Sequence, residues 1–115
     1  MQQSNIFLFQ KDIETETVGK GVTRQILGYN KELMLVKVLF KQGSVGEIHN
    51  HMHVQSSYIE SGKFEVSINN EKRILVTGDA FFVPSDIPHG VICLEAGVII
   101  DTFNPARKDF IETKL

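Results

Sequence analysis

Short runs of β-branched and aromatic residues, broken roughly every eight to twelve positions by Gly, Asn, Asp or Pro, dominate the chain. Residues 64–68 read Phe-Glu-Val-Ser-Ile, an alternation that marks one buried and one solvated strand face. No stretch has the 3.6-residue spacing of an amphipathic helix. The pattern therefore predicts an all-β chain. The predicted strands are residues 6–9, 21–28, 33–40, 45–51, 56–61, 63–68, 72–76, 80–83, 89–95 and 97–103.

Glycine, asparagine and proline indicate where these strands end. The segments 61–63 (SGK) and 69–71 (NNE) predict tight turns, because Gly and Asn tolerate the positive φ that hairpin turns require. The segment 82–90 (FVPSDIPHG) has two prolines that cannot donate ladder hydrogen bonds, so we expect a loop or an edge crossing there. So many short strands in a small chain predict a jelly roll or barrel, which also removes exposed sheet edges.

Length and charge limit the classes of protein to consider. The 115 residues suit one domain spanning residues 1–115, and a hydrophobic content of 42% is enough for a packed core. Twelve Lys and Arg against 14 Asp and Glu give a net charge of −2 without a basic run, so we expect no nucleic-acid partner. The single Cys93 excludes an internal disulfide. The N-terminal residues have no pattern of a signal peptide or membrane span, so we expect a cytoplasmic protein without a membrane partner.

Three of the four histidines lie within five residues, at His49, His51 and His53, and Gln55 follows them. Residues two apart on a strand share a face, about 6.6 Å apart at the backbone, so His49 and His51 can converge on one ion. A straight strand would carry Gln55 about 20 Å from His49, so Gln55 can join them only if the chain reverses. Such a reversal places His53 in the bend, where we do not expect it to bind the ion.

His89 is the remaining histidine and begins a predicted strand after the proline-rich loop. An imidazole from this neighbouring strand would complete a facial set, which suits one divalent ion of Zn, Ni, Co, Fe or Mn. A lone histidine on a strand is usually a core or surface residue, but the clustering favours a metal site. Cys93 would lie about 13 Å from His89 along an extended strand, so we expect it to pack in the core.

The spacing of these residues resembles that of the cupin superfamily. The first cupin motif, G-x5-H-x-H-x3-4-E-x6-G, is matched over about residues 43–62 by Gly43, His49, His51, Gln55 and Gly62, with Gln55 in place of Glu. The second motif, G-x5-P-x-G-x2-H-x3-N, is matched less well over about residues 78–93 by Gly78, Pro84 and His89, with Asp86 and Cys93 in place of Gly and Asn. The resemblance implies a single cupin domain, a jelly-roll barrel of the double-stranded β-helix type. It also implies a metal ion inside the barrel, held by His49, His51, Gln55 and His89.

Residues 49–66, 78–91 and 101–110 more narrowly resemble the KdgF-type pectin-degradation cupins. In that group Gln replaces the motif Glu, and a D-x-F-x3-R element, here residues 101–107, closes the barrel. The resemblance implies that the chain converts 4,5-unsaturated monouronates, released by pectate or alginate lyases, into linear 4-deoxy-5-keto forms. It therefore implies a small anionic sugar as the substrate. By analogy with other small cupins we expect a homodimer.

The chemistry of the residues is compatible with an acidic ligand. Three neutral imidazoles and an amide leave a divalent ion its full +2 charge, which attracts anions. Asp101 and Phe103 share a strand face, and an Asp beside an aromatic ring can have a raised pKa and transfer protons. Arg107 offers a planar guanidinium for a carboxylate. We expect Asp101 and Arg107 to be catalytic and Phe103 and Arg107 to bind substrate, although a capping aspartate, a core phenylalanine and a solvated arginine would give the same pattern.

Other interpretations stay open on the sequence alone. Arg24 is in phase with Val22 and Ile26, so it either lines the interior or lies at an edge where its charge reaches water. A cupin site of this kind also suits a dioxygenase with an open iron site, an isomerase of a different sugar, or a ligand-binding barrel without catalysis.

Overall fold

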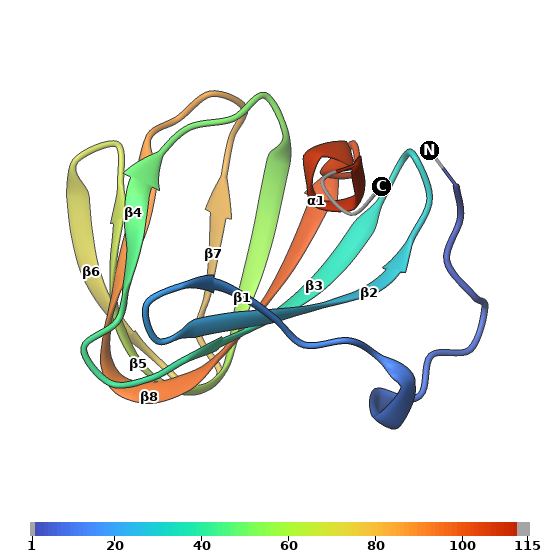
Figure 1. Cartoon of the computed structure of the whole chain (residues 1–115). Coiled ribbons are helices and arrows are strands. Elements are labelled where there is room, and N and C mark those ends of the chain that lie inside the picture. The colour runs from blue at the N-terminus through green and yellow to red at the C-terminus, as the bar shows by residue number, and fades with distance from the viewer. Residues whose placement is uncertain (1, 113–115) are drawn as a thin grey trace.

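Eight strands make up most of the structure, a computed structural model that describes residues 2–112 (Figure 1). The strands are β1 (Glu16–Gly19), β2 (Val22–Tyr29), β3 (Met34–Phe40), β4 (Val45–His49), β5 (Val54–Ile68), β6 (Glu71–Val76), β7 (Ala80–Val83) and β8 (His89–Asn104). A 3-10 turn, η1 (Gln10–Asp12), precedes them, and a short helix, α1 (Lys108–Glu112), follows. The all-β prediction is confirmed.

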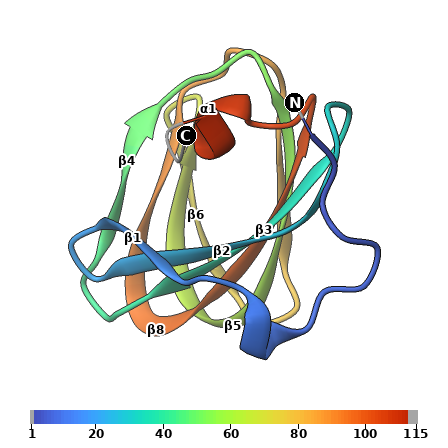
Figure 2. The ribbon, with the colours of Figure 1, turned by 45° about the vertical axis from the view of Figure 1, so that its right-hand side comes forward.

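β5 and β8 pair with each other along their length and contribute to both walls of a barrel. The first half of β5 also pairs with β7 and its second half with β6, while β8 pairs with β4 at its start and β3 at its end. One wall therefore has the order β1-β2-β3-β8-β5-β7 and the other β4-β8-β5-β6. Figure 2 shows the two walls facing each other, with α1 toward the end where β4 leads into β5. This is the predicted jelly-roll barrel.

The two long strands bend where two glycines meet. The predicted turn at 61–63 is wrong, because these residues form an irregularity within β5, and the strands predicted on either side are continuous. Gly62 has φ 91°, and a Cβ at this position would lie 2.7 Å from the Cα of Gly97 in β8. The paired glycines thus let the two backbones approach closely as both strands pass from one wall to the other.

Other expectations are confirmed or corrected locally. Asn69 and Asn70 have φ of 50° and 68° and form the predicted tight turn between β5 and β6. The predicted strand 6–9 is wrong, because Ile6 and Phe7 lie in a bend, each 78% exposed. β1 and α1 were not predicted, and β4 ends at His49 rather than at residue 51. The residues of β1 and the segment before it are mostly polar, so they lack the alternation of apolar residues that predicts a strand.

The buried side chains form two apolar clusters. Cys93, only 1% exposed, belongs to the first, where its thiol lies 3.2 Å from the carbonyl oxygen of Glu95. The predicted core position of Cys93 is therefore confirmed. Phe103 belongs to the second cluster, beneath the C-terminal segment. Across residues 2–112 no helix has the length and apolar character needed to cross a membrane.

Candidate metal centre

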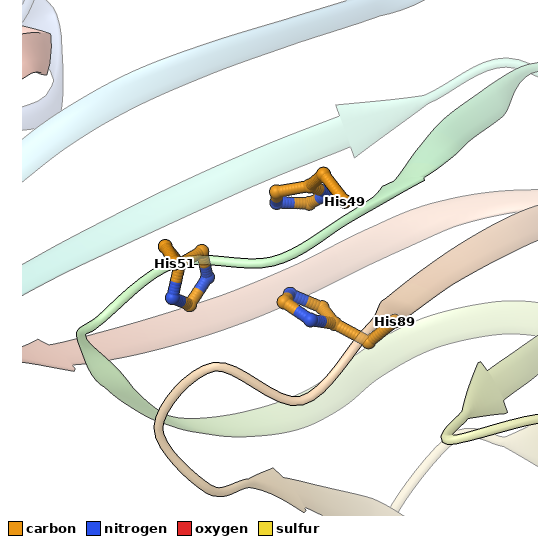
Figure 3. Close-up of side chains that lie close together, drawn as sticks. All are labelled: His49, His51 and His89. Atoms are coloured by element: carbon orange, nitrogen blue, oxygen red, sulfur yellow. The ribbon is translucent and has the colours of Figure 1, made fainter.

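Three imidazole rings face one another at one end of the barrel (Figure 3). His49 ends β4 and is the cross-strand partner of His89 at the start of β8, while His51 lies in the loop that follows β4. Neighbouring ring centres are 4.5 to 5.4 Å apart, and one nitrogen from each ring lies within 4.8 Å of the others. Three imidazoles so placed could hold one metal ion after small ring rotations.

The backbone fixes which ring nitrogen is available. The Nδ1 atoms of His49, His51 and His89 lie 2.8, 3.0 and 2.9 Å from the carbonyl oxygens of Glu47, His53 and Ile87. A carbonyl oxygen can only accept, so each Nδ1 carries the proton and each neutral ring presents an Nε2 lone pair. This is the tautomer that metal-binding histidines adopt.

Burial keeps two of these rings neutral. His89 is 4% exposed, and burial lowers its pKa to about 4 despite the hydrogen bond to Ile87, which opposes the change. The pKa of His51 is lowered mainly by burial and next by the charge of Arg107. The Nε2 of His89 is buried without a hydrogen-bond partner in the described residues. An unpaired buried acceptor is costly, and a bound cation would satisfy it.

Gln55 adds a fourth donor from the start of β5. Its Oε1 lies 3.1 Å from Nε2 of His51, while its Nε2 donates to Ser57 Oγ at 2.9 Å and to Asp101 Oδ1 at 3.3 Å. These two donations fix the orientation of the amide, so its oxygen faces a second lone pair. Two donors each about 2.1 Å from one ion and at right angles to it are about 3 Å apart. The residues present therefore fit a bound divalent cation, and the predicted chain reversal between residues 51 and 55 is confirmed.

Asp101 lies next to this donor set on β8, directly opposite Ser57 in the sheet register. Its Oδ1 accepts from Ser57 Oγ at 2.6 Å as well as from Gln55. Burial raises the pKa of Asp101 to about 6, although the hydrogen bonds from Ser57 and Gln55 and the charge of Arg107 act the other way. The pKa of Asp101 is thus raised in the direction considered for an Asp beside an aromatic ring, with burial as the main cause.

A cavity of about 950 Å³ extends from this end of the barrel into its interior. Its volume lies toward the upper end of typical small-molecule sites. Six of the seven predicted site residues contribute to its lining. They are His49, Gln55, His89, Asp101, Phe103 and Arg107.

Arg107 lies between β8 and α1 and is already paired. Its Nε and Nη2 donate to the two carboxylate oxygens of Asp109 at 3.2 and 3.1 Å. The guanidinium carbon lies 5.2 Å from the ring centre of Phe103 and 4.3 Å from that of Phe110. Only 13% of the Arg107 side chain is exposed, so it is not the solvated arginine that the sequence left open.

The match to known proteins agrees with this architecture. Residues 36–103 fit the family model described as a cupin domain. The chain belongs to the cupin family. This cupin is 47% identical over 98 residues to the pectin degradation protein KdgF of Dickeya dadantii (strain 3937), covering 84% of this chain and 89% of that protein. The narrower resemblance seen in the sequence is thereby confirmed.

Solved structures of relatives share the whole fold of this cupin. An RmlC-like cupin from Shewanella frigidimarina superposes with a TM-score of 0.93 at 47% identity, covering 96% of this chain and 99% of that one. KdgF from a Halomonas species superposes with a TM-score of 0.88 at 38% identity, covering 93% and 99%.

Two residues of the cupin site need separate mention. His53 lies in the bend after His51, as predicted, and burial is the main cause of its lowered pKa. Ser57, 2% exposed, was not singled out in the sequence although it joins Gln55 to Asp101. Its position two residues after Gln55 on one strand face was the available signal.

Proposed function

We propose that this cupin is a metal-dependent enzyme that converts 4,5-unsaturated monouronates into linear 4-deoxy-5-keto uronates. The observation that carries the proposal is the Gln55 amide, whose oxygen faces the imidazoles while its nitrogen donates to Asp101. The amide thus contacts both the neutral metal-binding groups and a carboxyl group whose pKa is about 6. The likeness to a pectin degradation protein supports uronates from pectin or alginate as the substrate class.

The proposed ligands of the ion are His49, His51, Gln55 and His89, and the donor types suit Ni, Zn, Fe, Mn or Co. A divalent ion held there would supply Lewis acidity and attract an anionic substrate. Because none of the four donors is charged, the site would keep a net charge of +2 for a carboxylate. A glutamate in place of Gln55 would reduce that charge.

The reaction is an isomerisation in two parts. The bond between C1 and the ring oxygen breaks, the C1 hydroxyl loses its proton to become a carbonyl, and the former ring oxygen gains a proton as an enol on C5. The enol then loses this proton from oxygen while C4 gains one, which leaves a ketone at C5. Both parts need a group that accepts and returns protons. Asp101 suits this role because a pKa of about 6 keeps both of its protonation states accessible near neutral pH.

Phe103 and Arg107 would hold the sugar acid against Asp101. Phe103, 3% exposed, forms part of the cavity wall, and the guanidinium of Arg107 lies beside its ring. Asp109, the present partner of Arg107, has a side chain that is 55% exposed. An incoming carboxylate that can also reach the metal would compete well with this exposed partner for the planar guanidinium.

Loss of ultraviolet absorbance from the substrate double bond tests the proposal. We expect metal-loaded protein to accelerate this loss above the uncatalysed rate with unsaturated sugars derived from galacturonate or mannuronate. Asp101→Asn keeps the size of the side chain but removes the proton-transfer group, so it should lower the rate on the order of 10²–10⁴-fold. Asp12→Asn is a matched control, because Asp12 is exposed in η1 and away from the cavity.

Two results would contradict the proposal. Tight binding of a uronate without acceleration would favour a ligand-binding barrel. Oxygen consumption by the iron-loaded protein in place of isomerisation would favour a dioxygenase.

A further inference from the structure

Arg24 places a second guanidinium in the same cavity. It lies on β2 between the buried residues Val22 and Ile26 and shares their inward face. Its side chain is 16% exposed and lines the cavity together with Asp101 and Arg107. An arginine on the inner face of a barrel wall is costly to desolvate, so its position calls for a partner.

Two neighbouring side chains contact the guanidinium group of Arg24. Nε of Arg24 donates to Oε1 of Glu16 at 2.6 Å, across the pairing of β1 with β2. The guanidinium carbon also lies 3.8 Å from the ring centre of Phe110. The bond to Glu16 uses the nitrogen nearest the stem, and a guanidinium carries four more N–H groups on its two terminal nitrogens.

Arg107 lies against the same ring of Phe110, at 4.3 Å from its centre. Both guanidinium groups therefore contact one aromatic ring and lie near each other. Both belong to the lining of one cavity, in which the charged residues among those described are four cations and two acids. They are Lys20, Arg24, Lys41 and Arg107 on one side and Glu47 and Asp101 on the other. Glu16 and Asp109 already offset the charges of the two arginines. What favours an anionic ligand is the group of guanidinium N–H donors, from which a carboxylate can accept.

We propose that Arg24 is a further substrate-binding residue, which acts with Arg107 to recognise the carboxylate of a sugar acid. The inference rests on the proposed function and extends it to a residue of β2. Phe110 of α1 contacts both guanidinium groups, so α1 would contribute to recognition as well as to packing. Arg24 would then discriminate a uronate from the neutral sugar of the same shape.

Kinetics of metal-loaded Arg24→Gln and Arg24→Lys test this role. We expect Arg24→Gln to raise KM for the unsaturated monouronate by roughly tenfold or more and to change kcat much less, because a charge-assisted hydrogen bond is lost. Arg24→Lys keeps the charge without the planar fork, so its KM should lie between those of the unmodified protein and Arg24→Gln. Arg73→Gln is the matched control, since Arg73 pairs with Glu71 on β6 with 69% of its side chain exposed. An unchanged KM in Arg24→Gln would overturn the inference.

Binding measurements separate this inference from the proposed reaction. Titration calorimetry with galacturonate and galactose compares a carboxylate with a hydroxymethyl group on the same ring. We expect Arg24→Gln to weaken galacturonate binding and leave galactose unaffected, even if the unmodified protein proved not to accelerate ring opening. Equal weakening of both sugars together with a lower melting temperature would show that Arg24 only supports the fold. Failure of the unmodified protein to bind any uronate would overturn both proposals.

Discussion

Replacing Gln55 with glutamate would place a second negative charge beside Asp101. The amide nitrogen of Gln55 lies 3.3 Å from Oδ1 of Asp101, and a glutamate oxygen in its place would face that carboxylate across the same gap. Two unit charges at this separation repel by about 5 kcal/mol at an effective dielectric constant near 20, and by about 1 kcal/mol in water. Since 1.36 kcal/mol corresponds to one pKa unit, the pKa of Asp101 would rise from about 6 by roughly one to four. The lost N–H donors of Gln55 would act in the same direction.

The expected result is a metal-loaded but slow enzyme. If the pKa of Asp101 reaches about 8, only about a tenth of it is ionised at pH 7, so kcat/KM at that pH should fall about tenfold or more. The activity maximum should move to higher pH, while added negative charge should keep or strengthen metal binding. Rate profiles against pH, with elemental analysis of bound metal, measure both effects.

Ser56→Glu provides the matched control for Gln55→Glu. Ser56 is the next residue of β5, but it is exposed and so adds the same charge outside the barrel. Its activity and pH profile should stay close to those of the unmodified protein. Unchanged kcat/KM and pH profile in a fully metal-loaded Gln55→Glu variant would refute the electrostatic reasoning.

Two further predictions concern the metal and the metal-free protein. His51→Ala should reduce bound metal from close to one ion per chain to near zero. Circular dichroism should still report a folded barrel, because the sheet hydrogen bonds do not involve the ring. Full metal occupancy in a His49→Ala, His51→Ala double variant would contradict the site. Between about pH 6 and 4, His89 binds more protons in the unfolded chain than in the folded one, so lowering the pH destabilises the metal-free fold. Asp101 binds more protons in the folded chain than in the unfolded one, so lowering the pH stabilises the fold through this residue. Asp101→Asn removes this stabilising effect, so the free energy of unfolding should fall by up to about 3 kcal/mol more between pH 6 and 4 than in the unmodified protein. Denaturant titrations at several pH values measure this fall, and an unchanged fall would count against the raised pKa.

The convergence of His49 and His51 was predictable because its geometry is local. His49 and His51 are close in sequence, and the need for a reversal before Gln55 followed from strand length alone. The strand pattern also identified the hairpin at Asn69 and Asn70 from backbone chemistry. A local pattern was not always sufficient, because the apolar residues 6–9 form no strand.

Features that depend on register between distant strands were not predictable in the same way. Gly62 reads as a turn residue, yet the backbone of Gly97 opposite it makes it a site of close strand crossing. The contact of Ser57 with Asp101 follows from the pairing of β5 with β8, which no periodicity encodes. The position of Phe110 against two arginines depends on a five-residue helix that is too short to give a helical pattern.

The three imidazoles take their orientation from carbonyl groups only two positions away in the chain. No distant side chain is needed to set their tautomers, so the β2 and β3 residues that line the cavity can be exchanged without disturbing those anchors. Chemistry at the ion and choice of ligand are thus divided between separate parts of one small barrel. A designer could redirect this scaffold toward other organic acids by changing only the β2 and β3 residues of the lining, with the hydrogen bonds of the three rings left as they are.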